Sequence, residues 1–278
     1  MSEQNDKSLK VIRPGDGRIA LQFLRLWEYR ELFFFLAWRD LKVRYKQTAL
    51  GIAWAVLQPL ATMLVLSIFF GRLAKIPSDG VPYPIFAYCA LVPWQMFAFV
   101  LTESGNSLVN NQFLLTKIYF PRLIVPIVPG LTALVDFAVA FAIMLGMMVF
   151  YGVAPKATIL LLPLFVVLAV LAAFAVGVWL AALTAEYRDV RYTIPFLTQF
   201  WMFATPIAYP SSLIPEKWRF FYGLNPMAGV VEGFRWALLG TAPTSLTPLF
   251  ASLGMVLALL YGGLIYFRRR ESTLADVI

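Results

Sequence analysis

The strongest constraint in this sequence is a basic stretch that changes abruptly into a long segment without charge. Arg39, Lys42, Arg44 and Lys46 precede a run over residues 47–71 in which no Lys, Arg, Asp or Glu occurs. A helix of that length crosses a hydrocarbon core of about 30 Å, because each helical residue adds about 1.5 Å. The pattern predicts a membrane-spanning helix with a cationic collar at its start.

The composition extends this prediction to the whole chain. Hydrophobic residues make up 60% of the 278 residues and charged residues only 14%, whereas about one quarter of an ordinary soluble domain is charged. A membrane admits only helices or closed barrels, and long uncharged runs without strict alternation favour helices. The sequence therefore predicts an all-α integral membrane protein.

The charge balance and the residue types exclude several functions. The net charge of +8 comes from basic residues that flank apolar runs, so contact with membrane lipids explains it better than binding of nucleic acid. The absence of histidine and the single cysteine, Cys89, remove the commonest metal ligand and an intrachain disulfide. No GxxxxGK[ST] loop occurs. We expect no metal, no bound cofactor and no enzymatic activity in this chain.

The apolar runs divide the chain into four regions. Residues 1–22 are predicted to be a disordered cytoplasmic tail, and residues 23–47 an amphipathic interface helix on the inner leaflet, because aromatic and basic residues both favour the headgroup region. An ordinary soluble helix packed on the membrane domain is the alternative for 23–47. Residues 48–270 form the expected membrane domain, and residues 271–278 a short cytoplasmic tail. The six expected spans are about 51–71, 84–105, 123–152, 157–184, 192–209 and 245–267.

Two regions are too interrupted to cross the membrane. Asn110 and Asn111 offer a cap before a short apolar stripe, which predicts a small helix outside the bilayer. Residues 210–243 contain four prolines, so helices there stay short. We expect two short re-entrant helices, at about 213–222 and at about 226–240, the second beginning at an Asn-Pro pair.

The positive charges predict the orientation of these spans. With the N-terminus in the cytoplasm, 17 of the 23 Lys and Arg residues lie on the inner side, as the positive-inside rule requires. This orientation puts both termini and the small helix near residues 113–121 in the cytoplasm. The proline-rich region 210–243 then lies outside.

Asp136 is the acidic residue that falls near the middle of an expected span. An intramembrane carboxylate is a functional candidate by default. No basic partner for it is evident in the other expected spans. The sequence therefore favours a structural or gating role over ion coupling.

Aromatic residues make up 16% of the chain, and headgroup anchoring does not explain all of those within spans. Most such residues face lipid or pack between helices. Rings that line a pathway would instead offer flat apolar faces on which sugar rings slide through weak, repeated contacts. The candidates for such a pathway are Trp54, Phe69, Phe70, Trp94, Phe97, Phe196, Phe200, Trp201 and Phe203.

Four motifs occur in order along the chain: RYKQTALGIAWAVLQPL (44–60), NNQFLLTKIYFPRLIVP (110–126), YRDVRYTIPFLTQFWMFATPIAYP (187–210) and LNPMAGVVEGFRWALLG (224–240). Together they resemble the membrane subunit of polysaccharide ABC exporters, the ABC-2-type permeases of O-antigen, capsule and teichoic acid export. The resemblance covers nearly the whole chain from about residue 23 onward.

The resemblance implies a homodimer of six-helix subunits in the inner membrane, docked to two copies of a cytoplasmic ABC ATPase that binds ATP and Mg²⁺. The complex would move a polyprenyl-diphosphate-linked polysaccharide outward. Residues 23–47 would be the interface helix, and the two outer helices would be gate helices. The coupling helix would lie in 112–121, and its candidate docking residues are Phe113, Leu114, Lys117, Ile118, Tyr119, Phe120, Pro121 and Arg122.

Four basic residues near the cytoplasmic mouth, Arg44, Lys46, Arg188 and Arg191, are candidates to meet the diphosphate of the lipid carrier through charge-assisted hydrogen bonds. The positive-inside rule alone also explains them.

Other interpretations stay open at this point. Within the family, teichoic acid, capsule or a smaller glycolipid is an alternative cargo. A membrane transferase acting on polyprenyl-linked sugars would need a polar catalytic cluster, which the sequence does not show. A secondary transporter would show paired repeats with ionisable groups at mid-depth, and only Asp136 fits that pattern.

Overall fold

The computed structural model describes residues 27–46, 53–118, 120–241 and 245–271, and the regular structure in these ranges is entirely helical. The predicted all-α class is confirmed. The predicted N-terminal tail, residues 1–22, and nearly all of the predicted C-terminal tail lie outside the described residues.

The helices follow one another along the chain with short connections. Lower-case η marks short 3₁₀ helices and one π-helical segment, which continues the helix before it. The elements are α2 (Arg30–Lys46), α3 (Ala53–Leu66), π-helical η1 (Ser67–Leu73), α4 (Tyr83–Asn110), α5 (Gln112–Lys117), α6 (Ile124–Phe150), η2 (Ala157–Leu161), α7 (Leu162–Glu186), α8 (Val190–Ala204), η3 (Ser211–Leu213), η4 (Glu216–Trp218), α9 (Arg219–Gly223), α10 (Pro226–Leu239) and α11 (Thr247–Glu271).

Five helical segments in the described part of the chain are long and apolar enough to cross a membrane. They correspond to five of the six expected spans, and they are Ala53–Leu73, Tyr83–Asn110, Ile124–Phe150, Ala157–Glu186 and Thr247–Glu271.

The remaining expected span, 192–209, is represented by the shorter helix α8. This helix has 15 residues and ends at Ala204, two residues before Pro206, which has no backbone N–H for a further helical turn. Its length is about 22 Å at about 1.5 Å per residue, which falls short of a core of about 30 Å. A sixth crossing therefore stays a prediction.

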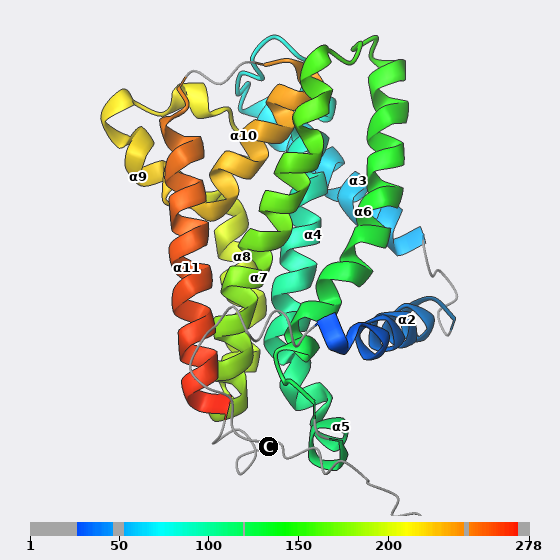
Figure 1. Cartoon of the computed structure of the whole chain (residues 1–278). Coiled ribbons are helices and arrows are strands. Elements are labelled where there is room, and N and C mark those ends of the chain that lie inside the picture. The colour runs from blue at the N-terminus through cyan, green and yellow to red at the C-terminus, as the bar shows by residue number, and fades with distance from the viewer. Residues whose placement is uncertain (1–26, 47–52, 119, 242–244, 272–278) are drawn as a thin grey trace, which may run out of the picture.

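The long helices form a bundle with two distinct ends (Figure 1). One end, called the α5 end below, carries α5 and the last turn of α11, and α2 lies crosswise to the bundle beside it. The opposite end, called the α9 end, carries α9 and the loops that precede α4 and α7. This arrangement places α5 and the proline-rich region at opposite ends of the bundle, as the sequence predicts.

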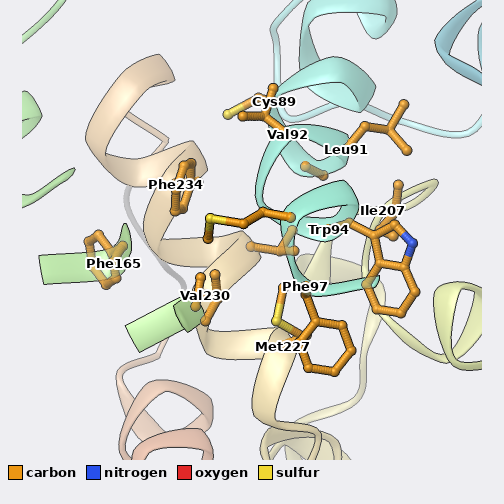
Figure 2. Close-up of a cluster of buried hydrophobic side chains, with 14 of the residues drawn as sticks. Cys89, Leu91, Val92, Trp94, Phe97, Phe165, Ile207, Met227, Val230 and Phe234 are labelled. Atoms are coloured by element: carbon orange, nitrogen blue, oxygen red, sulfur yellow. The ribbon is translucent and has the colours of Figure 1, made fainter. Parts of the chain in front are cut away.

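α4 is the central helix of the bundle. It contacts α3, α6, α7, α8 and α10, and every side chain from Ile85 to Trp94 is buried. Figure 2 shows Met227, Val230 and Phe234 of α10 facing this helix, with Phe165 of α7 beside Phe234. Cys89, within the same buried stretch of α4, is 0% exposed. A largely apolar core thus surrounds α4 along the α9 half of the bundle.

α10 confirms the predicted Asn-Pro start. Asn225 is the N-cap, because its side-chain oxygen accepts the backbone N–H of Met227 at 3.0 Å, and Pro226 is the first helical residue. The helix ends at Gly240 with a φ of 69°, a left-handed conformation that glycine adopts without strain. The observed bounds, Pro226–Leu239, match the expected 226–240.

The first expected outer helix, 213–222, is replaced by shorter pieces. The chain forms η3, then η4, then the five-residue α9. Pro215 is responsible in part, since it disfavours helical conformation at the residue before it. Whether α9 and α10 dip into a membrane and return stays a prediction.

Close packing of α10 against α7 depends on one glycine. A Cβ atom at Gly233 would lie 2.2 Å from two ring carbons of Phe165, well inside any permitted contact. Phe165 is only 2% exposed and sits in the core between the two helices. The absence of a side chain at residue 233 therefore sets how near α10 comes to α7.

Candidate functional site

The α5 end presents a small exposed apolar surface. Phe113 is 73% exposed and Ile118 is 53% exposed, and Lys117 is exposed between them along the chain. α5 contains six residues and ends at Lys117, because Ile118 adopts an extended conformation. The expected helix over 112–121 is therefore shorter than predicted. Tyr119 lies outside the described residues.

Phe120 does not belong to that exposed surface. It is 5% exposed and lies in an apolar cluster with Leu36 and Ala37 of α2 and Leu108 of α4. Leu114 packs against the same cluster. Phe120 is thus part of the protomer's own core, and a role for it in docking stays a prediction.

The remaining candidate docking residues are less exposed than Phe113 and less buried than Phe120. Pro121 and Arg122 are half-buried, and Nη1 of Arg122 donates a hydrogen bond to the backbone oxygen of Glu271, the last residue of α11. Arg122 thus ties the segment after α5 to the end of α11.

A second connection joins α2 to the junction of α4 and α5. Nη2 of Arg39 donates to the side-chain oxygen of Asn111 at 2.8 Å, and Nδ2 of Asn111 donates to the backbone oxygen of Ser107 at 2.9 Å. Asn111 occupies the N-cap position of α5, but its side chain makes no capping hydrogen bond there and instead bridges α2 and α4.

Asp136 has a basic partner, which comes from α2. Nη2 of Arg44 lies 2.7 Å from Oδ2 of Asp136, and the hydroxyl of Tyr45 donates to Oδ1. The Arg44 guanidinium also lies 4.1 Å from the ring centroid of Phe99 on α4. Burial, reinforced by the hydrogen bond to Asp136, raises the pKa of Tyr45 to about 12, so this hydroxyl keeps its proton at neutral pH.

The four basic residues predicted near the inner mouth occupy different elements. Arg44 is engaged with Asp136, and Lys46 is exposed at the end of α2. Arg188 lies exposed in the turn between α7 and α8, and Arg191 lies exposed in the first turn of α8. Arg44 and Arg191 are both charged neighbours of Glu103 on α4.

The nine candidate pathway aromatics separate into exposed and buried residues. Trp54 and Phe69 are each 57% exposed. On α8, Phe196, Phe200 and Phe203 are 71%, 66% and 55% exposed, and their spacing of four and three residues places them on one helix face. The rings of Phe196 and Phe200 stack with centroids 6.4 Å apart. These five side chains line open faces of the protomer.

Trp94 and Phe97 belong to the core instead. They are 2% and 0% exposed in this protomer, and a role for them in a pathway stays a prediction. Phe70 and Trp201 are partly buried. Trp201 packs edge-to-face on Phe97 at 5.2 Å, and its indole N–H donates to Asn225 at 2.9 Å. Trp201 therefore links α8 to the start of α10.

A cavity of about 140 Å³ lies between the Ala53–Leu73 segment and the end of α8 with the residues that follow it, and its walls are mainly apolar. The cavity is lined by Leu66, Phe70, Met202, Phe203, Thr205, Ile207, Ala208 and Tyr209.

Arg235 on α10 is a structurally important residue that no sequence motif had singled out. It is 4% exposed, and its guanidinium lies 3.6 Å from the ring centroid of Phe86 on α4. Nη2 donates to the backbone oxygen of Ile207 at 2.9 Å, and Nη1 to that of Tyr209 at 3.4 Å. The signal available in the sequence was an arginine three residues after Glu232 in a mostly apolar helix.

These hydrogen bonds hold the segment that follows α8. The hydroxyl of Tyr83 donates to the intervening backbone oxygen, that of Ala208, at 2.6 Å. Three consecutive carbonyl groups that leave the helical pattern are thus satisfied by side chains of α4 and α10. An apolar environment requires this, because a buried carbonyl without a partner is costly.

The sequence of this chain matches one family of known proteins. The family described as ABC-2 type transporter matches residues 31–239, which is most of the chain. This chain belongs to the ABC-2 type transporter family. It is a multi-pass permease subunit of an ABC transporter, a transport subunit and not an enzyme, and the family implies an ATPase subunit as its partner.

Individual relatives agree with this assignment. The chain is 28% identical over 256 residues to the O-antigen export system permease protein RfbA of Myxococcus xanthus, covering 91% of this chain and 97% of the relative. It is 26% identical over 242 residues to RfbA of Klebsiella pneumoniae, covering 86% and 92%. It is also 24% identical over 241 residues to the polysialic acid transport protein KpsM of Escherichia coli, covering 85% and 92%.

Proposed function

We propose that two copies of this ABC-2 permease form a passive path for a lipid-linked polysaccharide across the inner membrane. Two copies of a separate cytoplasmic ATPase, which binds ATP and Mg²⁺, drive this path open. The observation that carries the proposal is the open aromatic face of α8, formed by Phe196, Phe200 and Phe203.

The homodimer is supported by the way α8 sits in the protomer. Ile194 is its one fully buried side chain, so most of the helix has no cover from the described residues. Trp54 and Phe69 add open aromatic side chains on the neighbouring Ala53–Leu73 segment. A two-fold axis places the same face of each copy opposite the other, and this would enclose a path lined with rings.

An aromatic lining suits a carbohydrate chain that must keep moving. The flat rings offer apolar contact area without hydrogen bonds, so successive sugar units bind weakly at many similar positions. Conduction requires such weak, repeated sites, because a single tight site would stop the cargo. The names of the RfbA relatives support an O-antigen-like cargo, and the name of KpsM supports polysialic acid, a capsule-type glycan, as the alternative.

The ATPase docks at the α5 end in this proposal. Phe113 and Ile118 supply the exposed apolar contacts, and Lys117 supplies a charge beside them. The orientation that places most Lys and Arg residues in the cytoplasm also places α5 there. Lys46, Arg188 and Arg191, which are exposed, are the candidates for the diphosphate of the lipid carrier.

The test uses a bacterial strain that makes one polysaccharide but lacks the permease and the ATPase that export it. The chain is expressed with its ATPase, without it, and with an ATPase whose phosphate-loop lysine is replaced. Surface polysaccharide is then measured by immunoblot. We expect export only with the active ATPase, and export that survives without ATP hydrolysis would refute the proposal.

Orientation is tested separately with an introduced thiol. Lys117→Cys should react with a membrane-impermeant maleimide in inverted membrane vesicles and not in intact spheroplasts. The unmodified chain serves as the control, because Cys89 is buried and should stay unlabelled in both preparations. Labelling of residue 117 in intact spheroplasts would place α5 on the outer side and leave the ATPase without a docking site.

A further inference from the structure

α2 packs along α6, and polar side chains attach it at two further places. Its middle contacts the α5 end, where Arg39 bonds to Asn111 and Phe120 packs in the cluster that holds Leu36. Its last turn contacts α6 through the ion pair between Arg44 and Asp136. One helix therefore connects the proposed docking end to the interior of a membrane-spanning helix.

The second attachment is deep along α6. Asp136 follows Ile124, the first residue of α6, by about 18 Å of helix at about 1.5 Å per residue. Both carboxylate oxygens are used, one by Arg44 and the other by Tyr45. Figure 1 shows α2 running crosswise to the bundle beside the lower part of α6.

We propose that α2 is a strut that transmits displacement of the α5 end to α6, with the Arg44–Asp136 ion pair as its far attachment. This inference rests on the proposed function only in that a docked ATPase supplies the displacement. It assigns to Arg44 a positioning role inside the protomer, in place of contact with a lipid phosphate.

The Arg44–Asp136 ion pair is a stiff attachment because of where its two charges lie. A carboxylate in a membrane span is poorly solvated, so it strongly favours a nearby cation. Removing one partner leaves the other charge unpaired, and this costs more than breaking an exposed pair. The side chain of Asp136 is 17% exposed and that of Arg44 is 37% exposed, and the ring of Phe99 covers the guanidinium. The pair therefore fixes the last turn of α2 to the middle of α6, beyond the apolar packing that joins α2 to the first turns of α6.

A simpler role would be stabilisation of the fold alone. The two roles differ in one measurable ratio, the polysaccharide exported per ATP hydrolysed. A purely stabilising pair changes the amount of folded complex and leaves that ratio intact. A strut changes the ratio, since the ATPase still binds and hydrolyses ATP while less of its motion reaches the middle of α6.

The experiment compares Arg44→Gln, Asp136→Asn and the double variant, each co-expressed with the ATPase. Export and ATP hydrolysis are measured per copy of membrane complex. We expect each single variant to keep its ATPase and to export about tenfold less per ATP, a size typical of coupling between sites. The double variant should be no worse than the worse single one, because both remove the same link.

The matched control is Arg270→Gln, which breaks another partly exposed ion pair. Arg270 lies 3.2 Å from Glu186 and joins α11 to α7, away from α2. Its export per ATP should equal that of the unmodified chain. If Asp136→Asn does not accumulate, Arg44→Lys supplies the comparison, since lysine keeps the charge and loses the planar group over Phe99.

The outcomes separate the two proposals. An unmodified complex that hydrolyses ATP without exporting any polysaccharide refutes the proposed function. An unmodified complex that exports, together with single variants that export equally well per ATP, refutes the strut alone. Equal losses in the Arg270 variant would also refute it, since any partly buried ion pair would then have the same effect.

Discussion

Two phenylalanines seven residues apart give the sharpest test of how the α5 end is built. Phe113 is 73% exposed and Phe120 is 5% exposed. Truncation of an exposed residue away from structural features changes the free energy of unfolding by less than about 0.5 kcal/mol. Truncation of a buried phenylalanine to alanine costs about 3–5 kcal/mol, because apolar contacts are lost and a cavity remains. Phe113→Ala and Phe120→Ala should therefore differ strongly in stability.

The two variants should rank in the opposite order in their effect on affinity for the ATPase. An aromatic anchor at the centre of an interface contributes about 2 kcal/mol or more, which corresponds to roughly a 30-fold rise in Kd. We expect that rise for Phe113→Ala, which removes the exposed anchor. Phe120→Ala should bind the ATPase with nearly unchanged affinity per folded molecule, because the lost side chain is buried in an apolar cluster.

The assay measures both quantities on the purified permease in one detergent. Thermal unfolding reports the stability of the protomer, and titration with labelled ATPase reports Kd. Val149→Ala is the control, because Val149 is 83% exposed at the other end of α6 and should change neither quantity. Unchanged affinity in Phe113→Ala would remove α5 from the interface, and an unchanged melting temperature in Phe120→Ala would contradict its burial.

Further predictions concern the α9 end. Gly233→Ala should lower the free energy of unfolding by about 1–3 kcal/mol or more, since the added Cβ meets the buried ring of Phe165 at 2.2 Å. Gly254→Ala, with nothing within 4 Å of the added atom, should change it by less than about 1 kcal/mol in calorimetry. Tyr83→Phe should cost about 1–3 kcal/mol, because the backbone oxygen of Ala208 loses its donor; an unchanged melting temperature would contradict that role.

Features that depend on local sequence were predictable. Five of the spans follow from length and hydropathy, and the start of α10 follows from the Asn225-Pro226 pair. The short length of α8 was also visible in principle, because Pro206 stands within the expected span. The apolar stretch that follows Pro206 hid this signal, so the expected span continued to residue 209.

Features that depend on which helix face is covered were not predictable. Trp94 and Phe200 both lie in apolar helices, yet one is buried at 2% exposure and the other is 66% exposed. A helix that is apolar all round carries no periodic signal for the face it buries. Only the position of α4 at the centre and of α8 at the edge separates the two residues.

The partner of Asp136 was missed for a related reason. The other expected spans offer no cation near it, whereas Arg44 lies on α2, which crosses beside the bundle. Tertiary packing joins positions that are far apart in the sequence, and no spacing rule connects them.

The enclosure of Cys89 within α4 has a practical consequence. Because the chain has a single native thiol and that thiol has no exposed surface, a cysteine placed on the periphery would be the sole group that an aqueous thiol reagent meets in the native fold. Spectroscopic labels can thus be attached one position at a time without first rebuilding the centre of the molecule. Reactivity of Cys89 itself would then signal that the helices around α4 have come apart.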